Sequence, residues 1–248
     1  MSASVNGLAI GLDGSAVVHF GHGGASPYEL ALTQRRPTLI LRPRPGGRPD
    51  EPTTHIDAGV VEVGRFLADA DRVDRMVLSR TRGSVLDIGS GPGRMVAEAM
   101  RRGRVSLGID VSPAAVALAR ASGRPVLLQS VFDAVPDDGH WSTALLLDGN
   151  VGIGGDPGAL LARCAELITP GGTVAVETDC DPERDHRYHA ELVVDGEDGD
   201  VGSDSFPWAH VGTHVVESLA VAHGLVPSKR LRRGGRQFVL LRRAGQPE

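Results

Sequence analysis

The sequence contains few of the residues that mark several classes of protein. Only two cysteines, Cys164 and Cys180, occur in 248 residues, too few for a disulfide framework or a cysteine-rich zinc site. Lysine occurs once, at Lys229, and 31 acidic residues outnumber 26 basic ones, so a broad basic surface for nucleic acid is not expected. No apolar run approaches the about 18 residues of a membrane-spanning helix.

The remaining composition predicts a soluble globular protein. Hydrophobic residues make up 41% of the chain and the formal net charge is -5, which is sufficient for one good core. The amino terminus lacks the basic and apolar regions of a secretory signal. We therefore expect a cytoplasmic protein that binds no membrane and for which nucleic acid is an unlikely partner.

Composition divides the chain near residue 55. Residues 1–55 are rich in turn signals, including a Pro/Gly/Arg segment over 42–52, and predict a small amino-terminal appendage with a hairpin over 8–20 and a short strand at 38–41. Residues 56–248 alternate between helical and strand patterns, which is typical of a parallel sheet covered by helices on both faces.

Seven strands are predicted in this larger domain. Strand patterns occur over 84–88, 105–110, 125–129, 143–148, 173–177, 226–232 and 236–243, and helical patterns over about 73–78, 94–102, 114–121, 156–168 and 214–223. The polar, acidic segment over 178–210 is expected to be largely loop. The prediction is therefore an α/β protein with a glycine-linked hairpin at its carboxyl end.

A glycine-rich loop follows the first of these strands. Gly89, Gly91 and Gly93 stand between the strand and a helix, where backbone N–H groups can meet a ligand. Position 94 is Arg instead of the third glycine of the dinucleotide fingerprint, and Asp87 lies in the strand two residues before the loop. A buried carboxylate repels a pyrophosphate and attracts an ammonium group.

Asp110 ends the second strand, where an acidic residue can accept both hydroxyls of a ribose. Ribose and ammonium together indicate an amino-acid nucleoside. Through residues 85–94 and 108–113, the sequence resembles the class I S-adenosylmethionine-dependent methyltransferases. In residues 130–133, 146–157 and 206–209 it is similar to actinobacterial small-molecule methyltransferase-domain proteins.

The resemblance, over roughly residues 55–243, implies a Rossmann-like, seven-stranded and mostly parallel sheet whose last strand is antiparallel, with S-adenosylmethionine as cofactor. It implies that Asp87 and the glycine loop hold the methionine part and Asp110 the ribose, with Val111 against the adenine. Ser130 stands where many relatives have an acidic residue that contacts the adenine. The candidate cofactor-binding residues are Asp87, Gly89, Ser90, Gly91, Gly93, Asp110, Val111, Ser130, Val131 and Asp148.

Methyl transfer needs an oriented acceptor and, for an oxygen acceptor, a group that takes its proton. His186, His189 and His210 are the candidate bases, since imidazole accepts protons near neutral pH. Tyr28 is a candidate for a lid over the cofactor. Asp148 with Asp179 and Asp181 is a weak alternative for a divalent cation, and we expect no metal.

The resulting prediction is methylation of a small-molecule acceptor at oxygen or nitrogen. The alternative is an S-adenosylmethionine-binding module without transfer activity, because no unmistakable base or acceptor motif is present. RNA methylation through the basic carboxyl end is a lesser possibility, and a nicotinamide-dependent oxidoreductase is disfavoured by Arg94 and Asp87. The acceptor, the methylated atom and pairing into a homodimer stay open.

Overall fold

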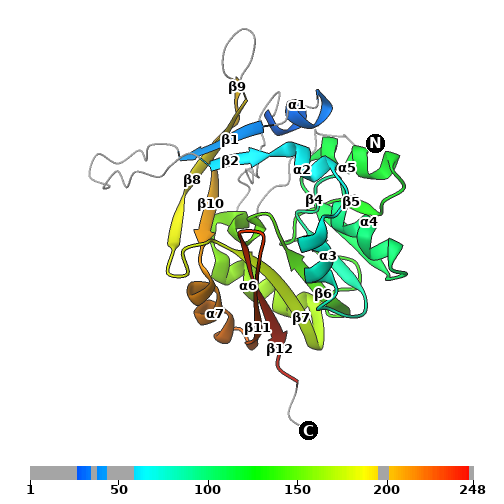
Figure 1. Cartoon of the computed structure of the whole chain (residues 1–248), viewed down its shortest axis with the longest axis vertical. Coiled ribbons are helices and arrows are strands. Elements are labelled where there is room, and N and C mark those ends of the chain that lie inside the picture. Colours follow the sequence, from blue (N-terminus) through cyan, green and yellow to red (C-terminus); the bar gives the residue numbers. More distant parts are fainter. Residues whose placement is uncertain (1–26, 35–37, 44–58, 195–200, 246–248) are drawn as a thin grey trace, which may run out of the picture.

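The computed structural model describes residues 27–34, 38–43, 59–194 and 201–245, and these form two sheets (Figure 1). The larger sheet has seven strands and the smaller has five, and the smaller lies across one end of the larger. Within this part of the chain, no helix is long and apolar enough to cross a membrane. The predicted hairpin over 8–20 lies outside the described residues.

The seven-stranded sheet has the order β11-β12-β7-β6-β3-β4-β5. Its strands are β3 (Val85–Ile88), β4 (Ser106–Asp110), β5 (Val126–Leu128), β6 (Trp141–Leu146), β7 (Ile168–Thr178), β11 (Leu225–Arg233) and β12 (Arg236–Arg243). Strands β5, β4, β3, β6 and β7 are mutually parallel, whereas β12 is antiparallel to both β7 and β11. The predicted Rossmann-like sheet with an antiparallel last strand is confirmed.

Helices cover both faces of this sheet, as predicted. They are α3 (Arg72–Leu78), α4 (Arg94–Arg101), α5 (Pro113–Ala121), α6 (Pro157–Leu167) and α7 (Thr213–Val221), with a short 3-10 helix, η1 (Asn150–Gly155). Apolar residues of α6 and α7 pack with one face of the central strands, and those of α3 and α4 pack with the other. The strands are apolar on both faces because each face is buried against helices.

The expected helix starts are present for clear physical reasons. Ser112 caps α5 by accepting a hydrogen bond from the Ala115 N–H, and Pro113 takes the first helical position. Asp156 caps α6 in the same way through its side chain. Strand β7 begins earlier than predicted, at Ile168, because the backbone becomes extended directly after the last residue of α6.

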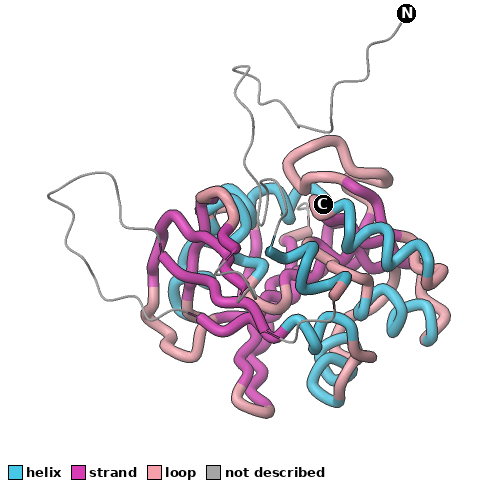
Figure 2. Tube along the Cα trace, turned by 90° about the horizontal axis from the view of Figure 1, so that it is seen from above, coloured by secondary structure: helices cyan, strands magenta, loops and turns pink. Residues whose placement is uncertain are grey.

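The smaller sheet, which we call the cap sheet, has the order β10-β8-β1-β2, with β9 (Val201–Gly202) paired to β8. Its other strands are β1 (Thr38–Pro43), β2 (Gly59–Glu62), β8 (Asp185–Val194) and β10 (Phe206–Val211). Seen from above, β8 and β10 lie on the left and α3, α4 and α5 on the right (Figure 2). Helices α1 (Pro27–Thr33) and α2 (Val63–Leu67) contribute to the same apolar cluster as the cap sheet.

The cap sheet corrects one expectation and extends another. The segment over 178–210 is not largely loop, because β8 and β10 form an antiparallel pair with a buried inner face. The predicted strand at 38–41 is confirmed as β1, which pairs with β2 on one side and β8 on the other. Strands from both sides of residue 55 therefore share a sheet, and the division of the chain at that residue stays a prediction.

Candidate functional site

A cavity of about 630 Å³ lies between the carboxyl ends of the central strands and the cap sheet. Its floor comes from the ends of β3, β4 and β6, and its roof from α1, β1, β2 and β10. This volume falls in the range of about 300–1,000 Å³ that is typical of small-molecule sites. Crossovers on both sides of β3 leave this edge of the sheet open, which is where ligands of doubly wound folds bind.

The glycine loop forms one wall of the cavity. Gly89, Gly91 and Gly93 have φ angles of 67°, 55° and 81°, which only glycine adopts without strain. Asn150 braces the loop, because its Nδ2 donates to the carbonyl oxygens of Ile88 and Gly89 at 2.8 and 2.9 Å. A Cβ at residue 89 would lie 2.7 Å from that nitrogen, so the loop and Asn150 fit only with glycine there.

The loop residues differ in their exposure to the cavity. Gly89, Ser90 and Gly91 line it, whereas Gly93 serves as the N-cap of α4 and does not. The Oγ of Ser90 is buried and has no hydrogen-bond partner in the part of the chain that the structure describes. The loop therefore presents its first three residues, and not its last, to a ligand.

Asp87 is a buried carboxylate with nothing to neutralise it. Its exposed fraction is 4%, and within the described ranges its side chain takes part in no hydrogen bond or ion pair. Burial raises the pKa of Asp87 well above its usual value, and the nearby charges of Asp148 and Asp110 raise it further. A cationic ligand group beside Asp87 would remove this penalty.

Asp110 is buried in a different manner. Its Oδ2 accepts the Gly91 N–H at 2.7 Å and its Oδ1 accepts the Ser112 N–H at 2.8 Å. Burial raises the pKa of Asp110, and these backbone hydrogen bonds oppose that rise. The carboxylate is thus held in a fixed orientation at the end of β4, and it lines the cavity together with Val111.

The segment after β5 closes the side of the cavity next to Asp110. Ser130 and Val131, two of the candidate cofactor-binding residues, both line it, and Gln129 and Phe132 line it too. The Ser130 Oγ accepts the Phe132 N–H at 3.3 Å, so this hydroxyl stabilises the local turn. Phe132 is half-exposed at the edge of the site.

Asp148 lines the cavity but is held by arginines. It forms ion pairs with Arg94, with Arg65 at 3.1 Å and with Arg236 at 3.4 Å. Asp148 also has a left-handed backbone with φ of 55°, which is strained for a residue with a side chain. Three guanidinium groups therefore neutralise this carboxylate, in contrast to Asp87 in the same cavity.

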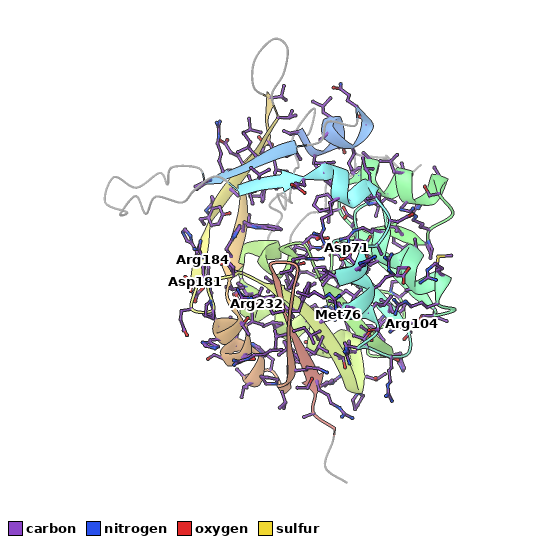
Figure 3. The ribbon with its side chains drawn as sticks, in the orientation of Figure 1. Asp71, Met76, Arg104, Asp181, Arg184 and Arg232 are labelled. Carbon is purple, nitrogen blue, oxygen red and sulfur yellow. The ribbon has the colours of Figure 1, made fainter. Side chains whose placement is uncertain are left out.

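The arginines belong to a larger buried cluster beneath the cavity. Asp74, which is 1% exposed, binds Arg94 and accepts from Arg236 at 2.7 Å and from Arg65 at 3.2 Å. Arg236 also pairs with Glu177. We call Arg65, Arg94, Arg236, Asp74, Asp148 and Glu177 the arginine cluster. In Figure 3, Asp71 marks the start of α3 near this cluster, whereas Asp181 and Arg184 lie on the opposite side, next to the paired strands β8 and β10.

Sequence reasoning missed this cluster, although one signal pointed to it. Arg94 occupies the place of a fingerprint glycine, yet nothing in the local pattern identifies its partners. Arg236 is 162 residues from Asp74 and 59 from Glu177. Such pairs are formed by the fold alone.

The cap supplies aromatic side chains. Tyr28 of α1 and Trp208 of β10 line the cavity, each only 5% exposed. A Cβ at Gly91 would lie 3.1 Å from the Tyr28 hydroxyl oxygen, so Tyr28 reaches over the glycine loop. Burial raises the pKa of Tyr28, and the charges of Asp110 and Asp148 add to the effect.

The three candidate histidines fall in different places. His210 lines the cavity, and its Nδ1 lies 3.8 Å from Asp179 Oδ2. His186 pairs with His210 across the β8–β10 register but does not line the cavity, and its ring lies 5.2 Å from that of Tyr188. His189 is exposed and, by strand alternation, belongs to the opposite face of β8 from His186.

His210 has the environment of a neutral imidazole. Burial lowers the pKa of His210, and the charges of Arg184 and His186 lower it further, whereas Asp179 acts in the opposite direction. Among the described residues, its buried Nε2 has no hydrogen-bond partner. At neutral pH the ring can accept a proton.

The weak alternative of a cation site finds no support in the geometry. Across the residues that the structure describes, no group of three His, Cys, Asp or Glu side chains is placed to hold a metal ion. Asp148 is committed to arginines, while Asp179 pairs with Arg184 at 3.3 Å.

The family comparison covers most of the chain. The sequence model of a methyltransferase domain family matches residues 63–226. Among curated proteins, no sequence matches the chain.

Solved structures share the fold. A methyltransferase from Bacteroides fragilis, in complex with S-adenosyl-L-homocysteine, superposes with a TM-score of 0.67 at 17% identity, over 88% of this chain and 92% of that one. The Burkholderia thailandensis 1,6-didemethyltoxoflavin-N1-methyltransferase superposes with a TM-score of 0.51 at 16% identity, over 73% of this chain and 81% of that one. A sugar N-methyltransferase from Streptoalloteichus gives 0.52 at 18% identity over 72% and 88%.

Proposed function

Since this chain belongs to the class I S-adenosylmethionine-dependent methyltransferases, we propose that it methylates an oxygen or nitrogen of a small-molecule acceptor. The observation that carries the proposal is Asp87, a buried carboxylate without a donor among the described residues, beside a glycine loop in a closed-over cavity. The volume of about 630 Å³ favours a small acceptor, because the cofactor must share it.

The residues present fit the cofactor. Asp87 would bind the ammonium group of its methionine part, and Gly89 and Gly91, which have no side chains, would let that part approach the loop backbone closely. Asp110 would accept the ribose hydroxyls, while Val111 and Val131 would pack on the adenine. When bound, S-adenosylmethionine supplies an electrophilic methyl group on a sulfonium.

The chain's own contribution is to orient the acceptor, exclude water and hold a proton. The cap sheet and α1 cover the open edge of the strands, and Trp208 and Tyr28 provide flat apolar walls for an acceptor. We assign to His210 the role of general base, because its residue lines the cavity and Asp179, at 3.8 Å from its Nδ1, can stabilise the charged ring.

Asp148 is better suited to positioning than to proton transfer. Its carboxylate is engaged by the guanidinium groups of the arginine cluster, which hold it in place. We propose that the cluster fixes the β6 end, and with it Asn150 and the glycine loop, in the shape that receives the cofactor.

The nature of the acceptor finds support in related enzymes. The Burkholderia structure contains 1,6-didemethyltoxoflavin with S-adenosylhomocysteine, and the Streptoalloteichus enzyme methylates a sugar nitrogen according to its name. Membership of an actinobacterial subgroup, a cytoplasmic location and pairing of two copies stay predictions.

Calorimetric titration of S-adenosylmethionine and S-adenosylhomocysteine tests the cofactor site. We expect wild type to bind both and Asp110→Ala to bind neither detectably. Asp133→Ala removes an exposed carboxylate after β5 that does not line the cavity, and should bind like wild type. Melting curves of all three proteins separate lost binding from lost folding.

Turnover is then followed with labelled cofactor and a panel of metabolites that includes alcohols, phenols and amines. Transfer of label to any of them supports the proposal. Tight cofactor binding without transfer to any acceptor would favour the alternative of a binding module, and a well-folded wild type that binds neither cofactor would refute the site.

A further inference from the structure

The charges that line the cavity have an uneven sign. Among the described residues, the lining cations are Arg65 and Arg94, and both are paired with carboxylates of the arginine cluster. The lining carboxylates Asp87, Asp110 and Glu62 have no cationic partner in that part of the chain. The cavity wall therefore presents carboxyl groups that no guanidinium neutralises.

This charge discriminates between acceptor classes. A carboxylate or phosphate entering the cavity would meet these carboxyl groups, while both lining arginines already form ion pairs with other carboxylates, so its desolvation would be poorly offset. A cationic group would be attracted. Under the proposed function Asp87 and Asp110 are used by the cofactor, which leaves Glu62 for the acceptor.

Glu62 occupies a suitable place for this role. It ends β2 in the roof of the cavity, and it both lines the cavity and is exposed to solvent. The neighbouring cavity surface is apolar and aromatic, with Val61 and Phe66 from the same part of the chain and Trp208 from β10. Aromatic faces attract cations more than they attract neutral hydroxyl groups.

We propose that the acceptor is an amine on an apolar skeleton, that Glu62 binds its ammonium form, and that His210 takes the proton that must leave before the nitrogen can react. The inference rests on the proposed methyl transfer and specifies its acceptor. The freed nitrogen lone pair forms the new N–C bond as the C–S bond of the sulfonium breaks, which leaves a neutral thioether. The proton remains on His210 until solvent removes it.

The proton step agrees with the environment of His210. Burial lowers the pKa of its ring, so the ring is neutral and ready to accept at neutral pH. Asp179 at 3.8 Å stabilises the imidazolium that results. Glu62 instead is the contact in the cavity roof that holds the ammonium group before it loses its proton.

The test measures binding in the absence of turnover. The protein is first saturated with S-adenosylhomocysteine. Two series of ligands are then titrated: benzylamine, benzyl alcohol and benzoate, and afterwards cyclohexylmethylamine, cyclohexylmethanol and cyclohexanecarboxylate. We expect each amine to bind at least about fivefold more tightly than the alcohol of the same skeleton, and the carboxylate to bind most weakly. Alcohols or carboxylates that bind as tightly as the amines, or amines that do not bind, would overturn the inference.

Paired variants identify the group responsible. Glu62→Gln should weaken amine binding about two- to fivefold and leave the alcohols unchanged, as expected for a partly solvated ion pair. Asp69→Asn removes an exposed carboxylate seven residues away that does not line the cavity, and should change neither. An amine affinity that Glu62→Gln leaves intact would contradict the role of Glu62.

The outcomes also separate this inference from the proposed function. Binding of S-adenosylhomocysteine is measured first, and its absence would count against methyl transfer itself. Binding of S-adenosylhomocysteine combined with a preference for alcohols would preserve the methyltransferase and refute only the amine.

Discussion

Replacement of Asp87 by asparagine should have opposite effects on the stability and the cofactor affinity of this protein. The carboxylate is 4% exposed and has no donor within reach among the described residues, so the cofactor-free protein pays a desolvation penalty for its charge. Asparagine has nearly the same shape and no charge. We therefore expect Asp87→Asn to stabilise the free protein and to weaken its binding of S-adenosylmethionine.

The magnitudes follow from the burial of the group. An unsatisfied buried acceptor costs about 1–3 kcal/mol, and more when it is charged, so removing the charge should raise the free energy of unfolding by about this amount. For a chain of this size, each kcal/mol shifts Tm by about 2–4 °C. A charge-assisted hydrogen bond to the ammonium group is worth about 1.5–3 kcal/mol, so cofactor affinity should fall about 10- to 150-fold.

The effect on stability depends on pH with a definite sign. The pKa of Asp87 in the folded state lies above the ordinary value of 3.8. At pH values between 3.8 and this raised pKa, the folded protein therefore binds one proton more than the unfolded chain. Wild-type stability contributed by this group falls as pH rises through that window. Asp87→Asn lacks that component, so its advantage in Tm should be larger at pH 8 than at pH 4 if the other groups titrate alike.

Asp110→Asn is the matched control, since it changes the neighbouring buried aspartate in the same way. Asp110 accepts two backbone N–H groups, at 2.7 and 2.8 Å, and an amide nitrogen turned toward either one would lose an acceptor. We expect Asp110→Asn to lower Tm. Differential scanning calorimetry and cofactor titration on both variants complete the assay. A lower Tm for Asp87→Asn, or an unchanged cofactor affinity, would refute the reasoning.

Three further predictions test the arginine cluster, the glycine loop and the proposed base. Arg94→Met should lower the free energy of unfolding by about 3 kcal/mol in urea titrations, because it breaks a buried ion pair, although Asp74 keeps two other arginines. The same change at the exposed Arg230 should leave the urea midpoint unchanged. A loss below about 1 kcal/mol for Arg94→Met would contradict the role of the cluster. Gly89→Ala should destabilise the protein by about 1–3 kcal/mol and weaken cofactor binding, because φ is 67° and the new Cβ meets Asn150 at 2.7 Å; an unaltered affinity in calorimetry would count against the loop geometry. The kcat of wild type should fall at acid pH only below pH 6.5, where His210 becomes protonated. His210→Gln should lose this acid fall in kcat together with about 100-fold or more of the rate. A pH profile that is the same in both proteins would exclude His210 as the base.

Much of the central sheet was predictable from local patterns. Residues 84–88 form a short apolar run with both faces buried, and Ser112-Pro113 is a helix start whose cap and first position use adjacent residues. Such signals depend on neighbours within a few positions. They therefore remain legible in the sequence alone.

The cap sheet was less accessible to the same reasoning. His186, Tyr188 and Ala190 alternate with exposed residues along β8, but the acidic, polar composition around them resembles a loop. Their strand is stabilised by β1, which lies more than 140 residues away along the chain. Pairing at such a distance decides the structure of the segment, and composition does not reveal it.

The candidate site was predictable in part for the same reason. Asp87, Gly89 and Asp110 line one cavity because the carboxyl ends of adjacent parallel strands meet at one edge of the sheet. The sequence could not rank His186, His189 and His210, since nothing in the neighbouring residues shows which side chain faces the cofactor. Of the three, only His210 lines the cavity, although His186 lies opposite it in the β8–β10 register.

The sequence by itself determined the order of strands and helices, the glycine loop and the two aspartates beside it, because each depends on short-range spacing and on which backbone conformations a residue allows. Only the tertiary structure decided that Asp148 is neutralised by arginines while Asp87 is not. That difference arises from Arg65, Arg94 and Arg236, which come from three separate elements. Burial and charge pairing are properties of the assembled fold, so the chemical state of each carboxylate becomes defined only when the chain is folded.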